Sequence, residues 1–146
     1  MYFIFGYVET ALTECVQLTS LTPTGIKGLA APVAASTGAA VAGTIFWNAY
    51  DEANGNSFLF DSKKELIVSN GGAGSVTLTL KTVNDTINGF ARTVADLVVT
   101  LAAGEIWHSG VLPATFNDAG KVKLTLVDVN PGDSLADCYL AVKKAI

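Results

Sequence analysis

Apolar and polar residues alternate along much of this chain. The clearest alternation covers residues 121–127, and residues 76–81 repeat it with threonines at the polar positions. A period of two places successive side chains on opposite faces of a strand, so each segment predicts a β-strand with one buried face. The more continuous apolar runs at residues 66–68 and 97–101 predict strands that are buried more fully. Further strands are predicted at residues 2–8, 43–50, 106–111 and 138–142.

Residues typical of turns, such as Asn88-Gly89, separate these runs. Residues 102–105 predict a tight β-hairpin and residues 70–74 a longer one. No segment has helical periodicity, and the alanine-rich residues 30–42 are interrupted by proline and glycine, which predicts a loop. The pattern therefore predicts an all-β fold, an antiparallel β-sandwich of jelly-roll or β-tulip type with an extended N-terminal arm.

A change in composition near residue 45 divides the chain. Residues 1–44 are predicted to form an N-terminal strand followed by an arm rich in glycine and alanine, and residues 45–146 the β-sandwich. The apolar start of the chain precedes this long leader and is difficult to place in the core of the sandwich. We expect it to be a strand that docks on a neighbouring molecule through Tyr2, Phe3, Ile4, Phe5 and Tyr7.

Composition narrows the classes of partner. Half of the 146 residues are hydrophobic and 15% are charged, and the mean hydropathy is +0.43. This predicts apolar surface that is covered by other subunits. No apolar run is long enough to predict a membrane span, and no secretory signal is visible. A net charge of −4 with a single arginine offers no basic stripe, so we expect neither nucleic acid nor a membrane as partner.

Residues suited to chemistry are few. His108 is the only histidine, and no cysteine or carboxylate stands at motif spacing from it, so a structural role is favoured. Residues 51–56 partly match a calcium loop but lack its regular ligands, and the glycines of residues 70–74 favour a turn over a phosphate cradle. We assign no catalytic, cofactor-binding or metal-binding residue. Cys15 and Cys138 are interpreted as buried free thiols, with a disulfide between them as the alternative.

Three aromatic residues are the ones most expected to act outside the core. Trp47, Tyr50 and Trp107 are candidates for a partner-binding surface because aromatic side chains concentrate binding energy and stack on sugars. Packing in the core is the alternative for each of them. The sequence alone leaves both interpretations open.

Five segments follow one another in a characteristic order of turns and strand ends: DEANGNSF (51–58), ELIVSNGG (65–72), VVTLAAGE (98–105), GVLP (110–113) and FNDAGKVKL (116–124). This order resembles that of tailed-bacteriophage capsid decoration proteins, also called cement or auxiliary head proteins. The resemblance covers about residues 51–128 and does not extend to the N-terminal third.

The resemblance implies a structural virion protein that is often a homotrimer. Such a protein binds the outer surface of the capsid, links neighbouring subunits of the major capsid protein, and is assembled in the host cytoplasm. The family transfers no catalytic residue and no cofactor. The alternative is a tail-associated or fibre-associated β-sandwich that binds carbohydrate or a receptor through Trp47, Tyr50 or Trp107. An enzyme would instead require His108 to lie with carboxylates in a pocket.

Overall fold

The computed structural model describes residues 9–15, 32, 34–83, 85–87, 89–92, 94–130 and 135–144. Within these residues the chain forms strands and one short 3-10 helix, and no α-helix. The elements are β1 (Thr10–Ala11), β2 (Asn48–Ala49), β3 (Asn56–Leu59), β4 (Lys64–Asn70), β5 (Val76–Leu80), β6 (Asp85–Ile87), β7 (Phe90–Arg92), β8 (Leu97–Leu101), β9 (Ile106–Val111), η1 (Ala114–Phe116), β10 (Lys121–Asp128) and β11 (Cys138–Lys144).

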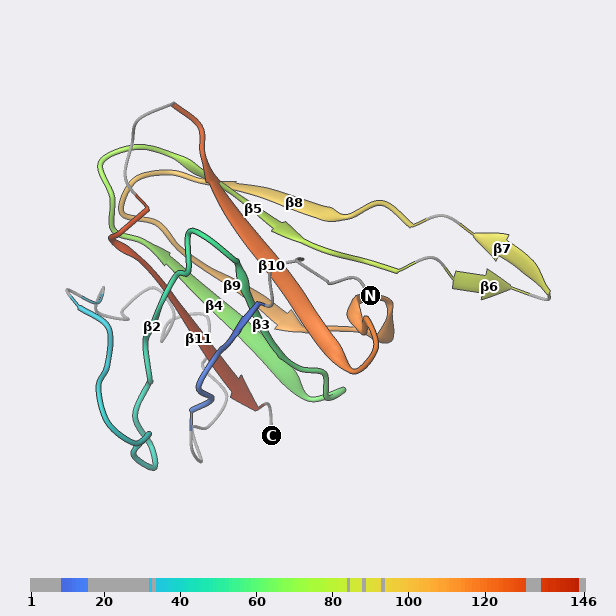
Figure 1. Ribbon diagram of the computed structural model, residues 1–146, viewed down its shortest axis with the longest axis horizontal. Coiled ribbons are helices and arrows are strands. Elements are labelled where there is room, and N and C mark those ends of the chain that lie inside the picture. The colour runs from blue at the N-terminus through green and yellow to red at the C-terminus, as the bar shows by residue number, and fades with distance from the viewer. Residues whose placement is uncertain are drawn as a thin grey trace, which may run out of the picture.

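Two sheets pack face to face (Figure 1). The first, sheet A, has the strand order β1-β3-β10-β5-β8, and the second, sheet B, has the order β2-β11-β4-β9. Neighbouring strands are antiparallel except β1 and β3, which are parallel. The all-β sandwich predicted from the alternation is confirmed.

The alternation of β10 and β5 accounts for the core between the sheets. Val122, Leu124 and Leu126 of β10 face inward beside Leu78 and Leu80 of β5, and all five are at most 3% exposed. The lysines and threonines between them face outward. Each fully buried aliphatic side chain contributes about 1.5–3 kcal/mol to stability, so these two strands supply a large part of the energy that joins the sheets.

Sheet B is covered on both faces, as the unbroken apolar run at residues 66–68 predicts. Leu66 and Val68 face the core between the sheets. Ile67 faces the other way, into a second cluster that includes Trp47 and Cys15. A strand buried on both faces needs apolar residues at successive positions, and this removes the alternation from β4.

Residues 9–15 lie within the segment expected to form an arm, and they contact both sheets. Thr10 and Ala11 pair with β3, and Glu14 forms a bridge with Val142 of β11. Leu12 is 6% exposed and belongs to the core between the sheets. This stretch is therefore part of the sandwich. The predicted strand at residues 2–8, with Tyr2, Phe3, Ile4, Phe5 and Tyr7, lies outside the described residues.

The turns at residues 70–74 and 102–105 form, but the prediction that they close β-hairpins is wrong. The first joins β4 of sheet B to β5 of sheet A, and the second joins β8 of sheet A to β9 of sheet B. Each turn therefore crosses from one sheet to the other. Turn residues specify a reversal of the chain locally, whereas the sheet that the next strand joins depends on distant partners.

Asn70 ties these two crossings together from a fully buried position. Its Nδ2 donates hydrogen bonds to the carbonyls of Gly74, at 2.9 Å, and of Leu101 and Ala102, both at 3.1 Å. Its Oδ1 accepts a hydrogen bond from the Gly72 N–H at 3.1 Å. One side chain thus supplies donors to both connections between the sheets and an acceptor to the first of them.

Replacing Asn70 with alanine is expected to lower the free energy of unfolding by about 2–4 kcal/mol, because buried carbonyls lose their donor and a cavity remains. Urea unfolding followed by tryptophan fluorescence measures this loss. Asn117→Ala is the matched control, because the Asn117 side chain accepts one exposed hydrogen bond from Gly120 N–H. We expect the control to lose about 1 kcal/mol or less. Equal losses for the two variants would contradict the role given to Asn70.

Candidate partner-binding surface

The two strands that flank the Asn88-Gly89 turn extend the sandwich into a long hairpin. β5 pairs with β8 and β6 pairs with β7, and the residue numbers of every pair add up to the same value, so both ladders share one register. We call β6, β7 and their connecting turn the distal hairpin. The pairs that mark the register are Val76 with Leu101, Leu80 with Leu97, Asp85 with Arg92, and Ile87 with Phe90.

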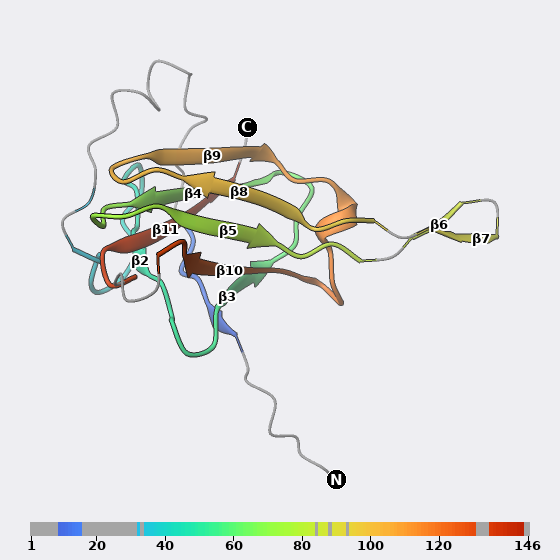
Figure 2. The ribbon, with the colours of Figure 1, turned by 90° about the horizontal axis from the view of Figure 1, so that it is seen from above.

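The distal hairpin extends well beyond the body of the sandwich in both views (Figures 1 and 2). Gly89 in its turn has a φ of 83°, a left-handed conformation that glycine adopts without steric cost. The sequence predicts this turn but no strand directly on either side of it. The residues that flank the turn show little alternation of apolar and polar positions, so the pattern does not mark them as strands. The features that point to this hairpin are the Asn-Gly pair and the register of β5 and β8.

Polar contacts fix the base of the distal hairpin. The Thr82 N–H donates to Asp96 Oδ1 at 2.9 Å, and the Thr82 hydroxyl donates to the Val94 carbonyl at 2.8 Å. The Val83 N–H donates to the carbonyl of Thr115 in η1 at 3.0 Å. These bonds hold the two chains together between the ladders and anchor them to the sandwich, so the hairpin leaves the body from a defined position.

Phe90, at the start of β7, is 77% exposed, the largest exposure among the large hydrophobic residues described. A two-stranded ribbon without further packing is only marginally stable in water. An open phenylalanine on such a ribbon therefore has the character of a contact residue, since burying it against another molecule gains about 1.5–3 kcal/mol.

Strand β8 is also more open than the sequence indicates. We predicted a largely buried strand at residues 97–101, but Val98 is 59% exposed and Leu97 37%, so this part of the prediction is wrong. The cause is position, because β8 lies at the edge of sheet A and has β5 as its only strand neighbour in the described part of the chain. On the outward face next to Val98 lie Thr79 and Thr125, which pair across the sheet.

The three aromatic residues considered for binding lie against the core. Trp47 is 8% exposed and belongs to the cluster on the outer face of sheet B. Tyr50 is half-buried, and its hydroxyl accepts a hydrogen bond from Leu126 N–H at 2.9 Å and donates to the Leu126 carbonyl at 3.2 Å. Trp107 is half-buried against the core between the sheets. These residues do not form an open aromatic platform, and among the described residues the most exposed aromatic side chain is Phe90.

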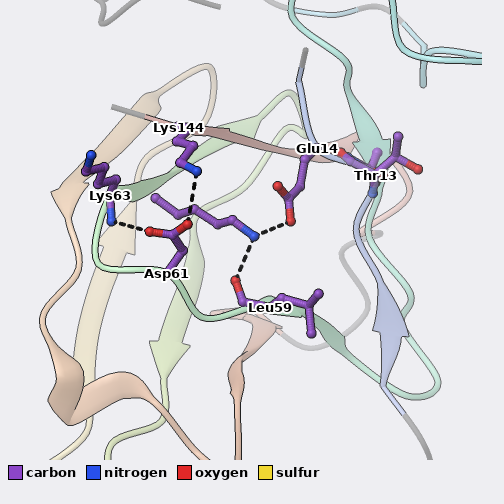
Figure 3. Close-up of polar contacts among 8 residues, drawn as sticks. Thr13, Glu14, Leu59, Asp61, Lys63 and Lys144 are labelled. Atoms are coloured by element: carbon purple, nitrogen blue, oxygen red, sulfur yellow. Dashed lines mark hydrogen bonds and ion pairs between the residues drawn. The ribbon is translucent and has the colours of Figure 1, made fainter. Parts of the chain in front are cut away.

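A group of ion pairs fastens the segment that contains Glu14 to the sandwich (Figure 3). Lys64 Nζ of β4 lies 2.5 Å from Glu14 Oε2 and donates to the Leu59 carbonyl at 3.0 Å. Beside it, Asp61 pairs with Lys144 of β11 at 3.2 Å. The Lys63 backbone N–H and, next, Lys144 lower the pKa of Asp61. The pair of Lys64 with Glu14 joins the segment that contains Glu14 to β4, and the pair of Asp61 with Lys144 joins the loop between β3 and β4 to β11.

Asp51, in the loop between β2 and β3, secures the start of the same segment. Its Oδ1 accepts hydrogen bonds from the N–H groups of Ala53, at 3.0 Å, and Asn54, at 3.1 Å, and its Oδ2 accepts one from the Thr10 hydroxyl of β1. The Thr10 hydroxyl and, next, the Asn54 side-chain amide lower the pKa of Asp51. In the loop considered for calcium, this carboxylate caps a turn and holds β1.

A charged triad lies deeper, on the outer face of sheet B. Glu65 of β4 places Oε2 2.6 Å from Lys143 Nζ of β11 and Oε1 2.7 Å from His108 Nε2 of β9. Lys143 is fully buried and Glu65 is 4% exposed. Burial is the main cause that lowers the pKa of His108, and the nearby Lys143 lowers it further. The Glu65 carboxylate acts in the opposite direction, but its effect is smaller than that of burial. The triad thus links three neighbouring strands.

The two cysteines are buried and free, which confirms the first interpretation of the sequence. Cys138 belongs to the core between the sheets, and Cys15 belongs to the cluster on the outer face of sheet B. Burial raises the pKa of the Cys138 thiol to about 11 and also raises the pKa of Cys15. Both thiols are therefore protonated at neutral pH and act as small apolar side chains.

Among the described residues no group of three or more histidine, cysteine, aspartate or glutamate side chains could hold a metal ion, and no helix is long and apolar enough to cross a membrane. No family model matches this chain, and no curated protein or solved structure is significantly similar to it. Any function proposed for this chain therefore rests on its own geometry and sequence.

Glu65→Gln is expected to lower the free energy of unfolding by about 3 kcal/mol or more, because it leaves the buried ammonium of Lys143 without a counter-charge. Chemical denaturation at neutral pH measures the change. Asp61→Asn is the control, since its partner Lys144 is 60% exposed and such pairs contribute about 1 kcal/mol or less. A loss for Glu65→Gln no greater than that of the control would show that the triad contributes little.

Acidification is expected to destabilise the fold from pH 6.5 downward. The pKa of His108 is below its ordinary value of 6.5 in the folded chain, so the unfolded chain binds a proton that the folded chain resists. The free energy of unfolding should therefore fall as pH decreases from about 6.5 to about 5, above the range where the aspartates titrate. Unfolding at a series of pH values measures this slope, and His108→Gln should flatten it. An unchanged slope in that variant would assign the effect to other groups.

Proposed function

We propose that this chain is a structural virion protein that binds the outer surface of a tailed-bacteriophage capsid and links neighbouring subunits of the major capsid protein. The observation that carries the proposal is the distal hairpin, which projects from a β-sandwich and exposes Phe90. The resemblance of residues 51–128 to decoration proteins supports the same function. The homotrimer implied by that resemblance is part of the proposal.

The distal hairpin is suited to a shallow site on a large protein surface. It presents the large apolar side chain of Phe90 on a narrow ribbon whose base is fixed by Thr82 and Asp96. A fixed base lowers the entropy lost on docking. A single contact of this size is weak, but several hairpins on one oligomer that engage a regular array of identical subunits gain strength through effective concentration.

The charge of the chain agrees with a position on the outside of a capsid. The net charge is −4, which favours a solvated surface and disfavours contact with packaged nucleic acid. The alternative of a carbohydrate-binding tail module depends on Trp47, Tyr50 and Trp107 as stacking surfaces. Their packing against the core gives that alternative less support.

The location is tested on particles produced by the organism that encodes this chain. An antibody against the purified protein is used on gradient fractions of the lysate, and positive particles are imaged by cryo-electron microscopy. We expect the protein to sediment with DNA-filled heads and to contribute regular density on the outer shell. Density confined to the tail, or protein found only in the soluble fractions, would overturn the proposal.

The role of the distal hairpin is tested on heads that lack the protein. Phe90→Ser is expected to weaken binding at least tenfold, about 1.4 kcal/mol, because the open aromatic side chain is lost. Val41→Ser is the matched control, since Val41 is 64% exposed and lies outside the hairpin, and it should bind like the unaltered protein. Cosedimentation over a range of protein concentrations measures both affinities.

A shortened hairpin gives a second test that does not depend on one side chain. Removing residues 82–87 and 90–95 joins Lys81 to Asn88 and Gly89 to Asp96, and the removal of six residues from each strand preserves the parity of the β5–β8 ladder. The shortened protein should fold and fail to bind heads. Full binding by this variant or by Phe90→Ser would show that the hairpin is not the contact.

A further inference from the structure

The four edges of the two sheets differ in how well they are protected against pairing. β1 and β2, at one edge of each sheet, have two residues each. β9, at the other edge of sheet B, has an irregular register opposite Glu65 and contains Gly110 with a φ of 69°. Short strands and bulges are the devices by which natural sheets prevent association at their edges.

β8 has none of these devices. All five of its residues pair with β5 in one regular register, and Leu97–Leu101 contains no charge, proline or glycine. Val98 and Thr100 are exposed. A regular, uncharged edge strand offers unpaired backbone N–H and C=O groups as a template for a further strand. β8 is therefore the edge of this sandwich that is suited to accept one.

The chain itself contains a segment of matching character. Residues 2–8, Tyr-Phe-Ile-Phe-Gly-Tyr-Val, carry no charge and are rich in aromatic and β-branched residues, which favour strands. They precede β1, which lies at the opposite edge of sheet A from β8. Four strand spacings separate the two edges, a distance of about 19 Å.

The length of this segment excludes pairing within one copy. Residues 2–9, which lead up to Thr10, span about 26 Å when extended. A segment that crossed the sheet from β1 would have about 7 Å left, which is roughly two residues, and could not align with the five residues of β8. The β8 edge of a neighbouring copy is not subject to this limit, because the neighbour can lie next to the start of β1.

We propose that residues 2–8 of one copy pair with β8 of the next copy and add a sixth strand to its sheet A. In a strand, Phe3, Phe5 and Tyr7 share one face, so pairing would place their apolar side chains together against the neighbour. β1, which follows the donor segment in the sequence, and the acceptor strand β8 lie at opposite edges of sheet A, so the contact is head-to-tail. Head-to-tail contacts form rings such as trimers when the rotation from one copy to the next closes, and filaments when it does not.

This inference goes beyond binding to a capsid, and it is tested on the purified protein without particles, so loss of head binding leaves it unaffected. The native mass is measured by light scattering for the unaltered chain, for a variant lacking residues 1–8 and for Val98→Lys. We expect an oligomer for the first and monomers for the other two. The added charge at position 98 opposes pairing at the β8 edge.

Val127→Lys is the control. Val127 is 56% exposed against 59% for Val98 and lies on the same outward face, but it belongs to the central strand β10. This variant should remain an oligomer. Circular dichroism verifies that each variant is folded. A monomeric unaltered protein, or equal loss of the oligomer in both lysine variants, would overturn the proposal.

Cross-linking identifies the contact directly. Ile4→Cys and Val98→Cys are prepared as separate proteins, mixed, and treated with a short bismaleimide, while the native thiols remain shielded by burial. A linked pair that contains one chain of each kind is expected and is intermolecular by design. Linkage only between two chains carrying Val98→Cys would indicate that β8 pairs with its own copy, and it would refute the proposed exchange.

Discussion

The register of the long hairpin formed by residues 76–101 is the constraint on which the rest of this structure depends. It directs Leu78 and Leu80 into the core between the sheets and places Thr77 and Thr79 on the outward face. Its continuation beyond the sandwich forms the distal hairpin. Because β8 receives no strand on its second side in the described part of the chain, the same hairpin also leaves an open edge.

The sequence predicted strands well where burial follows a local rule. The alternation at residues 121–127 and 76–81 corresponds closely to β10 and β5, because one face of each strand packs in the core. It could not show that the turns at residues 70–74 and 102–105 cross between sheets, since this depends on Asn70 and on distant strand partners. It also gave no strand at residues 85–92, where pairing follows the register of neighbouring strands and not burial.

The candidate surface was less predictable than the fold for a similar reason. Trp47 and Trp107 are candidates for binding because of their residue type. The exposure of their side chains depends on the segments that pack against them, and these come from elsewhere in the chain. Lys143 illustrates the converse, since a lysine near the end of a strand normally reaches water. Here it is fully buried with Glu65 and His108. Removing these charges from water costs free energy, and the contacts among the three side chains define the alignment of β4, β9 and β11.

Part of the exposed apolar surface of the described residues lies on one hairpin. Phe90, Leu97 and Val98 all belong to the hairpin of residues 76–101, and the contacts of Thr82 with Asp96 and Val94 separate its tip from its edge. The tip offers a side chain, whereas the edge offers unpaired main-chain groups, and the two kinds of contact have different requirements. A side chain needs only a complementary apolar site, but an edge needs another extended chain in register. The two proposed contacts are therefore compatible, because the tip of the hairpin can contact the shell while the β8 edge pairs with another copy of the chain.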